Sequence, residues 1–276
     1  MRTMPFRVKE NAPVTESKKP YVLESVERAL LILESFHPEG LEFGVIELSR
    51  KLQLSPSVVH RLLTSLQNRG FVQQNAATKK YRLSVKVFEI GSLAINHSLR
   101  EAALPWLEEL MRETGASVHL SILDGNDIVY VERVNSPKPI QIRTPIGGRA
   151  PAHCSATGKA ILAFEAPSVL DGVLAAGLYA YTSASVTDAN ALRAELEAIR
   201  RRGYSISAGE WRGEIAAIGA PVMGYTRKVV GGLGLSLPIS DFSEADGHRL
   251  GRIVVSKAAG VSASLGYTGV YQEARS

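Results

Sequence analysis

One short segment brings together side chains that hydrogen-bond nucleic acid. Between residues 55 and 70, apolar residues recur at helical spacing, as in a helix with one face toward a core. At 100° per residue the opposite face and its flanks carry hydroxyl, amide, imidazole and guanidinium groups but no acid. Such groups pair with base edges and with phosphate oxygens. The candidate DNA contacts, with the serine that begins the segment included, are Ser55, Ser57, His60, Arg61, Thr64, Ser65 and Asn68.

The distribution of charge favours the same chemistry. The chain has 276 residues and a net charge of +5. Residues 1–83 hold 13 lysines and arginines against 8 acids, whereas residues 84–276 hold 19 of each. No acid occurs between residues 48 and 88, a window that contains eight bases. A basic segment without acids is the pattern expected of a protein that binds a polyanion.

A second group of residues suggests different chemistry. His153 and Cys154, together with Asp124, would suit a cysteine-dependent hydrolase, and the histidines would suit a metal sensor. However, sequence neighbours point in opposite directions on a strand, and a lone cysteine is more often a small buried residue. The six histidines and one cysteine show no metal-ligand spacing, and no phosphate-loop or dinucleotide motif appears. We therefore predict no enzyme activity, no cofactor and no metal, and keep the hydrolase and the metal sensor as alternatives.

Three helices must position the polar face. The first is expected to begin at the N-cap Ser25 and to end before Pro38 and Gly40. A second covers 45–52, and a tight connection leads to the third, in which Pro56 is favoured at the first helical position. The side chains expected to face the core in the first two helices are Val26, Ala29, Leu30, Leu33, Phe36, Ile46 and Leu48.

A basic hairpin follows the third helix. Residues 71–74 and 81–83 read as two strands, and the loop between them ends in Lys79 and Lys80. A hairpin tipped with lysines beside a recognition helix is a wing that can grip backbone phosphate. The sequence thus predicts a mobile arm at 1–21 and a winged helix-turn-helix DNA-binding domain at 22–83.

The remainder of the chain alternates helices and strands. A linker helix is expected at 84–98 and an effector-binding domain at 99–276. The expected strands are 117–123, 128–134, 140–144, 215–223 and 228–237, and the expected helices are 99–114, 155–164, 188–202 and 244–265. This order predicts an α+β fold, with an antiparallel sheet and helices to one side of it.

Several runs of sequence resemble the IclR family of bacterial transcription regulators. In the first half they are SVERALLILESF, GVIELSRKLQLSPSVVHRLLTSLQNRGFVQQ and KKYRLSVKVFEIG. In the second half they are DIVYVERVNSP, APAHCSATGKAILA, TDANALRAELEAIRRRGYSIS, GEIAAIGAPV and VVGGLGLSLP. The resemblance implies a homodimer, or a dimer of dimers, on palindromic operators. It also implies an antiparallel-sheet α/β effector domain of GAF- or profilin-like architecture.

The resemblance further implies where a small organic acid effector would bind. The step from 153 to 158 offers backbone N–H groups at a helix start, and glycines in a facing strand would let a ligand approach the backbone. The positions that match the family's effector contacts are Ala156, Thr157, Ser207, Ala217, Gly234 and Ser236. Relatives that bind small 2-oxo acids carry an acid at the position of Ser207, a cysteine at Ala217 and a serine at Gly234. These departures favour a larger, less polar carboxylate, such as an aromatic acid.

No run of residues is long and apolar enough for a membrane span, and the mean hydropathy is +0.01. The N-terminus has no apolar stretch of the kind found in secretory signals. We therefore expect a cytoplasmic protein whose partners are double-stranded DNA, an organic acid and further copies of itself, and not a membrane.

Overall fold

The computed structural model describes residues 22–36, 41–94, 97–138 and 145–269. The chain divides into two compact units, Met1–Ala94 and Ile95–Ser276, which are taken separately below. The expected arm at 1–21, the helix stop at Pro38 and Gly40, and the expected strand at 140–144 lie outside the described residues.

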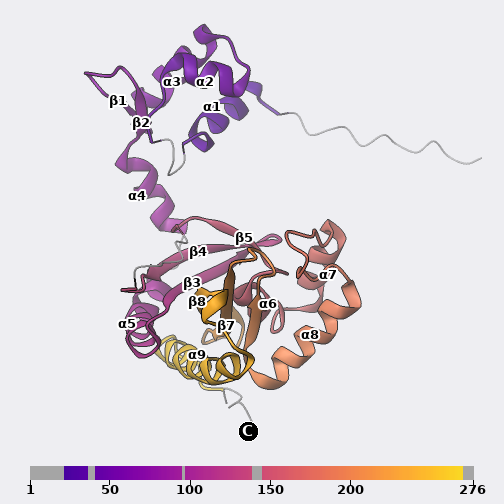
Figure 1. Cartoon of the computed structure of the whole chain (residues 1–276). Helices are drawn as coiled ribbons and strands as arrows, with labels where there is room; N and C mark the ends of the chain where they lie inside the picture. Colours follow the sequence, from indigo (N-terminus) through magenta and orange to yellow (C-terminus); the bar gives the residue numbers. More distant parts are fainter. Residues whose placement is uncertain (1–21, 37–40, 95–96, 139–144, 270–276) are drawn as a thin grey trace, which may run out of the picture. The chain divides into compact units, whose positions relative to one another are not determined.

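The first unit is a three-helix core with a two-stranded wing (Figure 1). Its elements are α1 (Glu24–Glu34), α2 (Val45–Leu52), α3 (Pro56–Asn68), β1 (Val72–Gln74), β2 (Tyr81–Leu83) and α4 (Val85–Ala94). The buried side chains of its core come from α1, α2, α3 and the wing: Ile32, Leu48, Val59, Leu63, Val72 and Tyr81. The winged helix-turn-helix fold is confirmed.

Two details of α1 and α2 differ from the prediction. Helix α1 begins at Glu24, so Ser25 lies inside it and is not its N-cap. Val26, Leu30 and Ile46 were expected in the core but are about half exposed, whereas Ile32 is fully buried. The first helix has apolar residues around most of its circumference, so the spacing alone did not fix which side faces the core.

The described residues of the second unit form one antiparallel sheet of six strands in the order β5-β4-β3-β8-β7-β6. The strands are β3 (Ser117–Asp124), β4 (Asp127–Val134), β5 (Arg149–Pro151), β6 (Ser205–Ala208), β7 (Ile215–Met223) and β8 (Val229–Pro238). The helices are α5 (His97–Thr114), α6 (Ala156–Leu162), α7 (Pro167–Ala176), α8 (Ala189–Arg202) and α9 (Glu244–Ser264), with a short 3₁₀ turn at Ile239–Asp241. The α+β class is confirmed, although α7, β5 and β6 are not among the expected elements.

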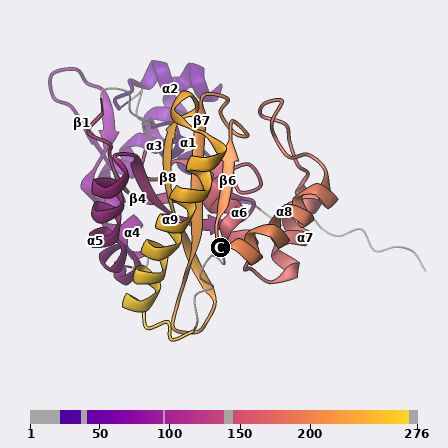
Figure 2. The same cartoon turned by 60° about the horizontal axis from the view of Figure 1, so that its bottom comes forward.

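The helices cover both faces of this sheet, so the expectation that they lie to one side is wrong. Helices α5 and α9 pack side by side on one face, against Ile218, Leu233 and Leu235 (Figure 2). Helix α6 lies on the other face, and α7 and α8 pack outside it. Glycines make this second layer possible, because Gly219 and Gly232 leave room for the backbone of α6 to approach the strands closely.

Candidate functional site

Helix α3 presents the polar face that its spacing predicted. Ser55 is the N-cap residue, Pro56 occupies the first helical position, and Gly70 after the helix has a positive φ of 77°. The turn from α2 is held by Gln53 in the left-handed region and by the Ser49 hydroxyl, which donates to the carbonyl of Leu54 at 2.6 Å. All seven candidate residues of α3 and its N-cap are exposed to solvent: Ser55, Ser57, His60, Arg61, Thr64, Ser65 and Asn68.

Two of these hydroxyls are already used as donors. Thr64 donates to the carbonyl of His60 at 2.9 Å, and Ser65 donates to the carbonyl of Arg61 at 3.0 Å. Because a hydroxyl also has two acceptor lone pairs, these side chains still present acceptors outward. On this face the donors that remain for DNA are those of Arg61, His60 and Asn68, and one hydroxyl of the Ser55–Ser57 pair, whose oxygens lie 3.2 Å apart.

The two wing lysines, Lys79 and Lys80, differ in their surroundings. Lys79 is exposed, at a backbone φ of 58°. Lys80 pairs with Glu47 of α2, at 2.8 Å between Nζ and Oε1. A hydrogen bond from the backbone of Gly44, together with Lys80, lowers the pKa of Glu47. Glu47 lies one residue before the acid-free window of residues 48–88. That window therefore gave no indication that Lys80 has an acidic partner.

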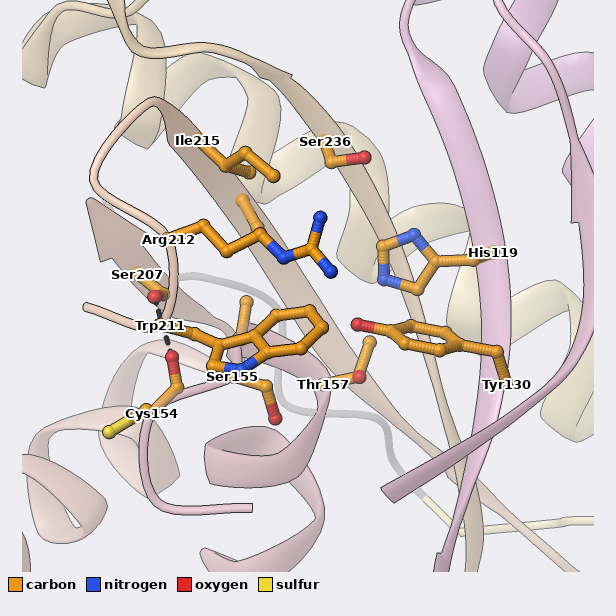
Figure 3. A pocket seen from close by; sticks show the side chains of 12 residues that line it. His119, Tyr130, Cys154, Ser155, Thr157, Ser207, Trp211, Arg212, Ile215 and Ser236 are labelled. Atoms are coloured by element: carbon orange, nitrogen blue, oxygen red, sulfur yellow. Dashed lines mark hydrogen bonds between the residues drawn. The ribbon is translucent and has the colours of Figure 1, made fainter. Parts of the chain in front are cut away.

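A pocket lies on the α6 face of the sheet in the second unit. It encloses about 430 Å³ of space, part of it continuous with solvent. Figure 3 shows side chains from β3, β4, β6, β7 and β8, from the residues at the start of α6 and from the segment after β6 around it. Twelve residues line it: His119, Tyr130, Cys154, Ser155, Ala156, Thr157, Ser207, Trp211, Arg212, Ile215, Ala217 and Ser236.

Five of the six candidate effector residues are among these twelve. The structure brings together Ala156, Thr157, Ser207, Ala217 and Ser236. Gly234 is not part of the lining, but it pairs with His119 across β8 and β3. The hydroxyl of Ser207 donates to the carbonyl of Cys154 at 2.8 Å, and that of Ser121 donates to Thr157 Oγ1 at 2.7 Å. Ser207 and Thr157 thus also fasten α6 to its neighbours.

Sequence reasoning missed the residues that give the pocket its aromatic and charged character. Those are His119, Tyr130, Trp211, Arg212 and Ile215. One signal was present for the first, because Ser117, His119 and Ser121 alternate with the apolar Val118 and Leu120. Alternation of this kind places the polar side chains on the face opposite α5 and α9.

His119 and Tyr130 are buried in the pocket and neutral at pH 7. Burial lowers the pKa of His119 to about 4 and raises that of Tyr130 to about 12. The two rings meet edge to face, with 5.1 Å between their centroids. A neutral imidazole offers one donor and one acceptor to a ligand.

Two further polar atoms of the pocket are buried without a partner in the described part of the chain. They are the hydroxyl oxygens of Ser155 and Ser236. A buried hydroxyl that makes no hydrogen bond costs about 1–3 kcal/mol of folding free energy. Both residues line the pocket, so a polar ligand there would satisfy them.

The geometry around Cys154 does not match that of a nucleophile. The side chain is fully buried, and this burial raises the pKa of the thiol to about 11, so it is not ionised at pH 7. The neighbouring imidazole of His153 instead lies 3.1 Å from the carbonyl of Tyr179. Among the described residues, no three His, Cys, Asp or Glu side chains gather as a metal site would require.

In the ranges that the structure covers, no helix has the length and apolar character needed to cross a membrane.

Both units match families of known proteins. Residues 25–76 match the IclR helix-turn-helix domain, and residues 92–263 match the bacterial transcriptional regulator IclR C-terminal domain. The Escherichia coli K12 regulators XynR and KdgR are each 32% identical to the chain, over 89% of it and 98% of XynR, and over 91% of it and 95% of KdgR.

Solved structures agree with these matches. The Thermotoga maritima IclR structure is 29% identical, with a TM-score of 0.73 over 88% of this chain and 99% of that one. An IclR homologue from Microbacterium hydrocarbonoxydans, complexed with 4-hydroxybenzoate, has a TM-score of 0.77 at 25% identity, over 88% of this chain and 99% of that one.

Proposed function

The chain belongs to the IclR family of bacterial transcription regulators, and we propose that a small organic acid in the pocket of its second unit controls how its first unit binds an operator. The observation that carries the proposal is the coexistence of an exposed, acid-free α3 face with a pocket lined by aromatic residues and one cation. The domain limits 22–83, 84–98 and 99–276 are part of this proposal, as is a cytoplasmic location.

On DNA, helix α3 enters the major groove and the wing contacts phosphate. In this arrangement Arg61, His60 and Asn68 read base edges or phosphates, and Lys79 grips the backbone. Two copies on a palindrome would address half-sites about 34 Å apart, one helical turn of DNA.

Exposed apolar side chains support self-association as a dimer. On α4, Val85 and Phe88 are 69% and 68% exposed, and Val26 and Leu30 of α1 are about half exposed. Identical copies carry identical faces, so a two-fold axis can bury such a face against itself. Sedimentation that detected only monomers at micromolar concentration would contradict this part of the proposal.

The salt dependence of DNA binding should distinguish the two wing lysines. We expect Lys79→Gln to reduce the slope of log K against log salt by about 0.9, the value for one phosphate contact. Lys80→Gln should change it less, because Glu47 already neutralises that charge. Glutamine, like lysine, is not β-branched, so the left-handed backbone at residue 79 is no less tolerable. The measurement is fluorescence anisotropy with duplex from upstream of the protein's own gene, at about 50 to 200 mM salt.

If both variants kept the wild-type slope, the wing would not touch phosphate. A wild-type protein with no salt-sensitive affinity for any duplex, with or without ligand, would overturn the proposed DNA binding altogether.

The pocket supports an aromatic acid as the effector. Tyr130 and Trp211 supply aromatic walls, as small-molecule sites commonly have. Ala217 is a small residue in the wall, which leaves room for a ring. That a relative of the same fold is complexed with 4-hydroxybenzoate is consistent with this class of ligand.

Aromatic acids should stabilise the protein more than short 2-oxo acids. A ligand at about 100 times its Kd adds about 2.7 kcal/mol to the free energy of unfolding. For a unit of this size that corresponds to a rise in Tm of about 5–10 °C. The measurement is a thermal-shift titration with benzoate and 4-hydroxybenzoate, against glyoxylate and pyruvate. Stabilisation by glyoxylate or pyruvate alone would count against an aromatic effector.

A further inference from the structure

Arg212 is the charged member of the pocket lining. Of the twelve described residues that line the pocket, those with titratable side chains other than Arg212 are His119, Tyr130 and Cys154. Burial keeps each of these three neutral at pH 7. At that pH the lining therefore carries a single positive charge, which belongs to a guanidinium.

The guanidinium is oriented into the pocket. Figure 3 shows it directed toward His119 and Tyr130, above the indole of Trp211. Its Cζ atom lies 4.6 Å from the centre of the Trp211 ring. A guanidinium stacked on an indole loses part of its rotational freedom and keeps its N–H edge available for hydrogen bonds.

Within the described ranges no carboxylate pairs with Arg212. Glu210, two residues earlier, instead contacts Lys159, at 2.6 Å between Nζ and Oε1. Other arginines of this unit do have acidic partners, such as Arg100 with Glu132 and Arg149 with Asp124. Glu210 is thus already engaged with Lys159.

The buried polar atoms around the guanidinium indicate a ligand with more than one polar group. The unpartnered hydroxyls of Ser155 and Ser236 both lie in the lining, and both residues are 5% exposed. The neutral ring of His119 adds a donor and an acceptor beside Tyr130. An aromatic acid with a ring hydroxyl carries two such polar groups, a carboxylate and a hydroxyl.

We propose that Arg212 selects an anionic effector by binding its carboxylate through two parallel hydrogen bonds, while the effector's ring lies against Tyr130 and Trp211. This inference rests on the proposed aromatic acid effector and adds the residue that makes the site an anion site. Arginine suits the role because its planar fork matches the two oxygens of a carboxylate. The other candidate partner for the carboxylate is the set of backbone N–H groups at the start of α6. That helix has only seven residues.

Benzoate and its neutral isostere benzamide test the inference by isothermal titration calorimetry. The wild type should bind benzoate more tightly than benzamide. Arg212→Gln removes the charge and keeps a polar side chain, and we expect it to weaken benzoate binding by about 10- to 150-fold, the worth of a hydrogen bond to a charged group. Its affinity for benzamide should change by less than about threefold. Arg212→Lys, which keeps the charge without the fork, should fall between the two.

The matched control is Arg252→Gln, which makes the same change at an exposed arginine of α9, on the opposite face of the sheet. It should leave both affinities unchanged. Benzamide binding by Arg212→Gln also reports that the variant's pocket is folded. If Arg212→Gln bound benzoate as tightly as the wild type, Arg212 would not be the anion partner, although the effector site would stand. If the wild type bound none of the aromatic acids, the proposed effector class itself would be wrong.

Discussion

Replacing Lys159 by methionine should lower the free energy of unfolding of the second unit by about 3–5 kcal/mol, the cost of leaving a buried charge without its partner. The Lys159 side chain is fully buried. Its Nζ atom lies 2.6 Å from Glu195 Oε1, 2.6 Å from Glu210 Oε1 and 2.9 Å from the carbonyl of Ile206. Methionine preserves the length of the side chain, so the loss reports the charge and its hydrogen bonds. Urea unfolding followed by circular dichroism measures it.

Lys257→Met is the matched control, because Lys257 also bridges two glutamates, Glu109 and Glu113, at 3.1 and 3.0 Å. Those glutamates are 45% and 44% exposed, so water solvates them when the lysine is removed, and the cost should be at most about 1 kcal/mol. The double variant Lys159→Met with Glu210→Gln should recover part of the loss, since it leaves less unpaired charge. Equal losses at the two lysines would show that burial of the partners does not govern the effect.

The loss at Lys159 should also grow with pH. Burial raises the pKa of Glu210 to about 7 in the wild type, and Lys159 is the main group that opposes this rise. Because the folded-state pKa lies above the ordinary value of 4.5, the folded state binds more protons than the unfolded chain, and stability falls as pH rises from about 4.5 to about 7. Without Lys159 the pKa of Glu210 rises further, so the fall continues above pH 7. The cost of Lys159→Met should therefore be larger at about pH 8 than at about pH 5, and an equal cost at both would contradict this account.

The charge cluster of Lys159, Glu195 and Glu210 also explains how the pocket wall is held. Glu210 directly precedes Trp211 and Arg212, while Lys159 lies on α6 and Glu195 on α8. The Thr182 and Ser185 hydroxyls donate to the carbonyls of Gly209 and Glu210, at 2.6 Å each. These bonds fix the start of the segment that carries the two pocket residues, which is a support that a precise binding site needs.

The sequence predicted what depends on local patterns and missed what depends on which strands are neighbours. Helical spacing and turn residues were sufficient for the bounds of α2 and α3 and for the wing, and with them for the exposed face around Arg61. Nothing in the local sequence marks Lys159 as buried, because a lysine in a helix normally lies in solvent. The positions of Tyr130 and Arg212 beside His119 follow from the strand order of the sheet and from a segment between strands, and neither has a periodic signal.

The sequence predicted a role for the glycines of the pocket sheet, and the structure adds a second one. They were expected to let a ligand approach the backbone. In the structure, a Cβ atom on Gly232 would lie 2.9 Å from Thr157 Cβ, and one on Gly234 would lie 2.7 Å from Thr157 Cγ2. The space beside these strands is thus occupied by α6 itself, and the glycines set how closely the helix start and the sheet can meet.

Gly219→Ala should therefore destabilise the second unit by about 3 kcal/mol, the upper end of the usual cost of overpacking. The added Cβ atom would lie 2.7 Å from the Thr157 nitrogen and 2.8 Å from its Cα, and backbone atoms cannot rotate away as a side chain can. Gly172→Ala is the control: it makes the same change in α7, where a Cβ atom meets nothing within 4 Å, and removing a helical glycine should stabilise the unit by about 0.5–1 kcal/mol.

Thermal unfolding of the two variants separates local packing from a general effect of alanine. Because α6 must shift to admit the methyl group, Ala156 and Thr157 move with it, and both line the pocket. Gly219→Ala should accordingly weaken benzoate binding as well as stability, whereas Gly172→Ala should change only stability. A Gly219→Ala variant with wild-type Tm and wild-type affinity would mean that α6 and the sheet are not in close contact, and the start of α6 could not then be a fixed wall of the pocket.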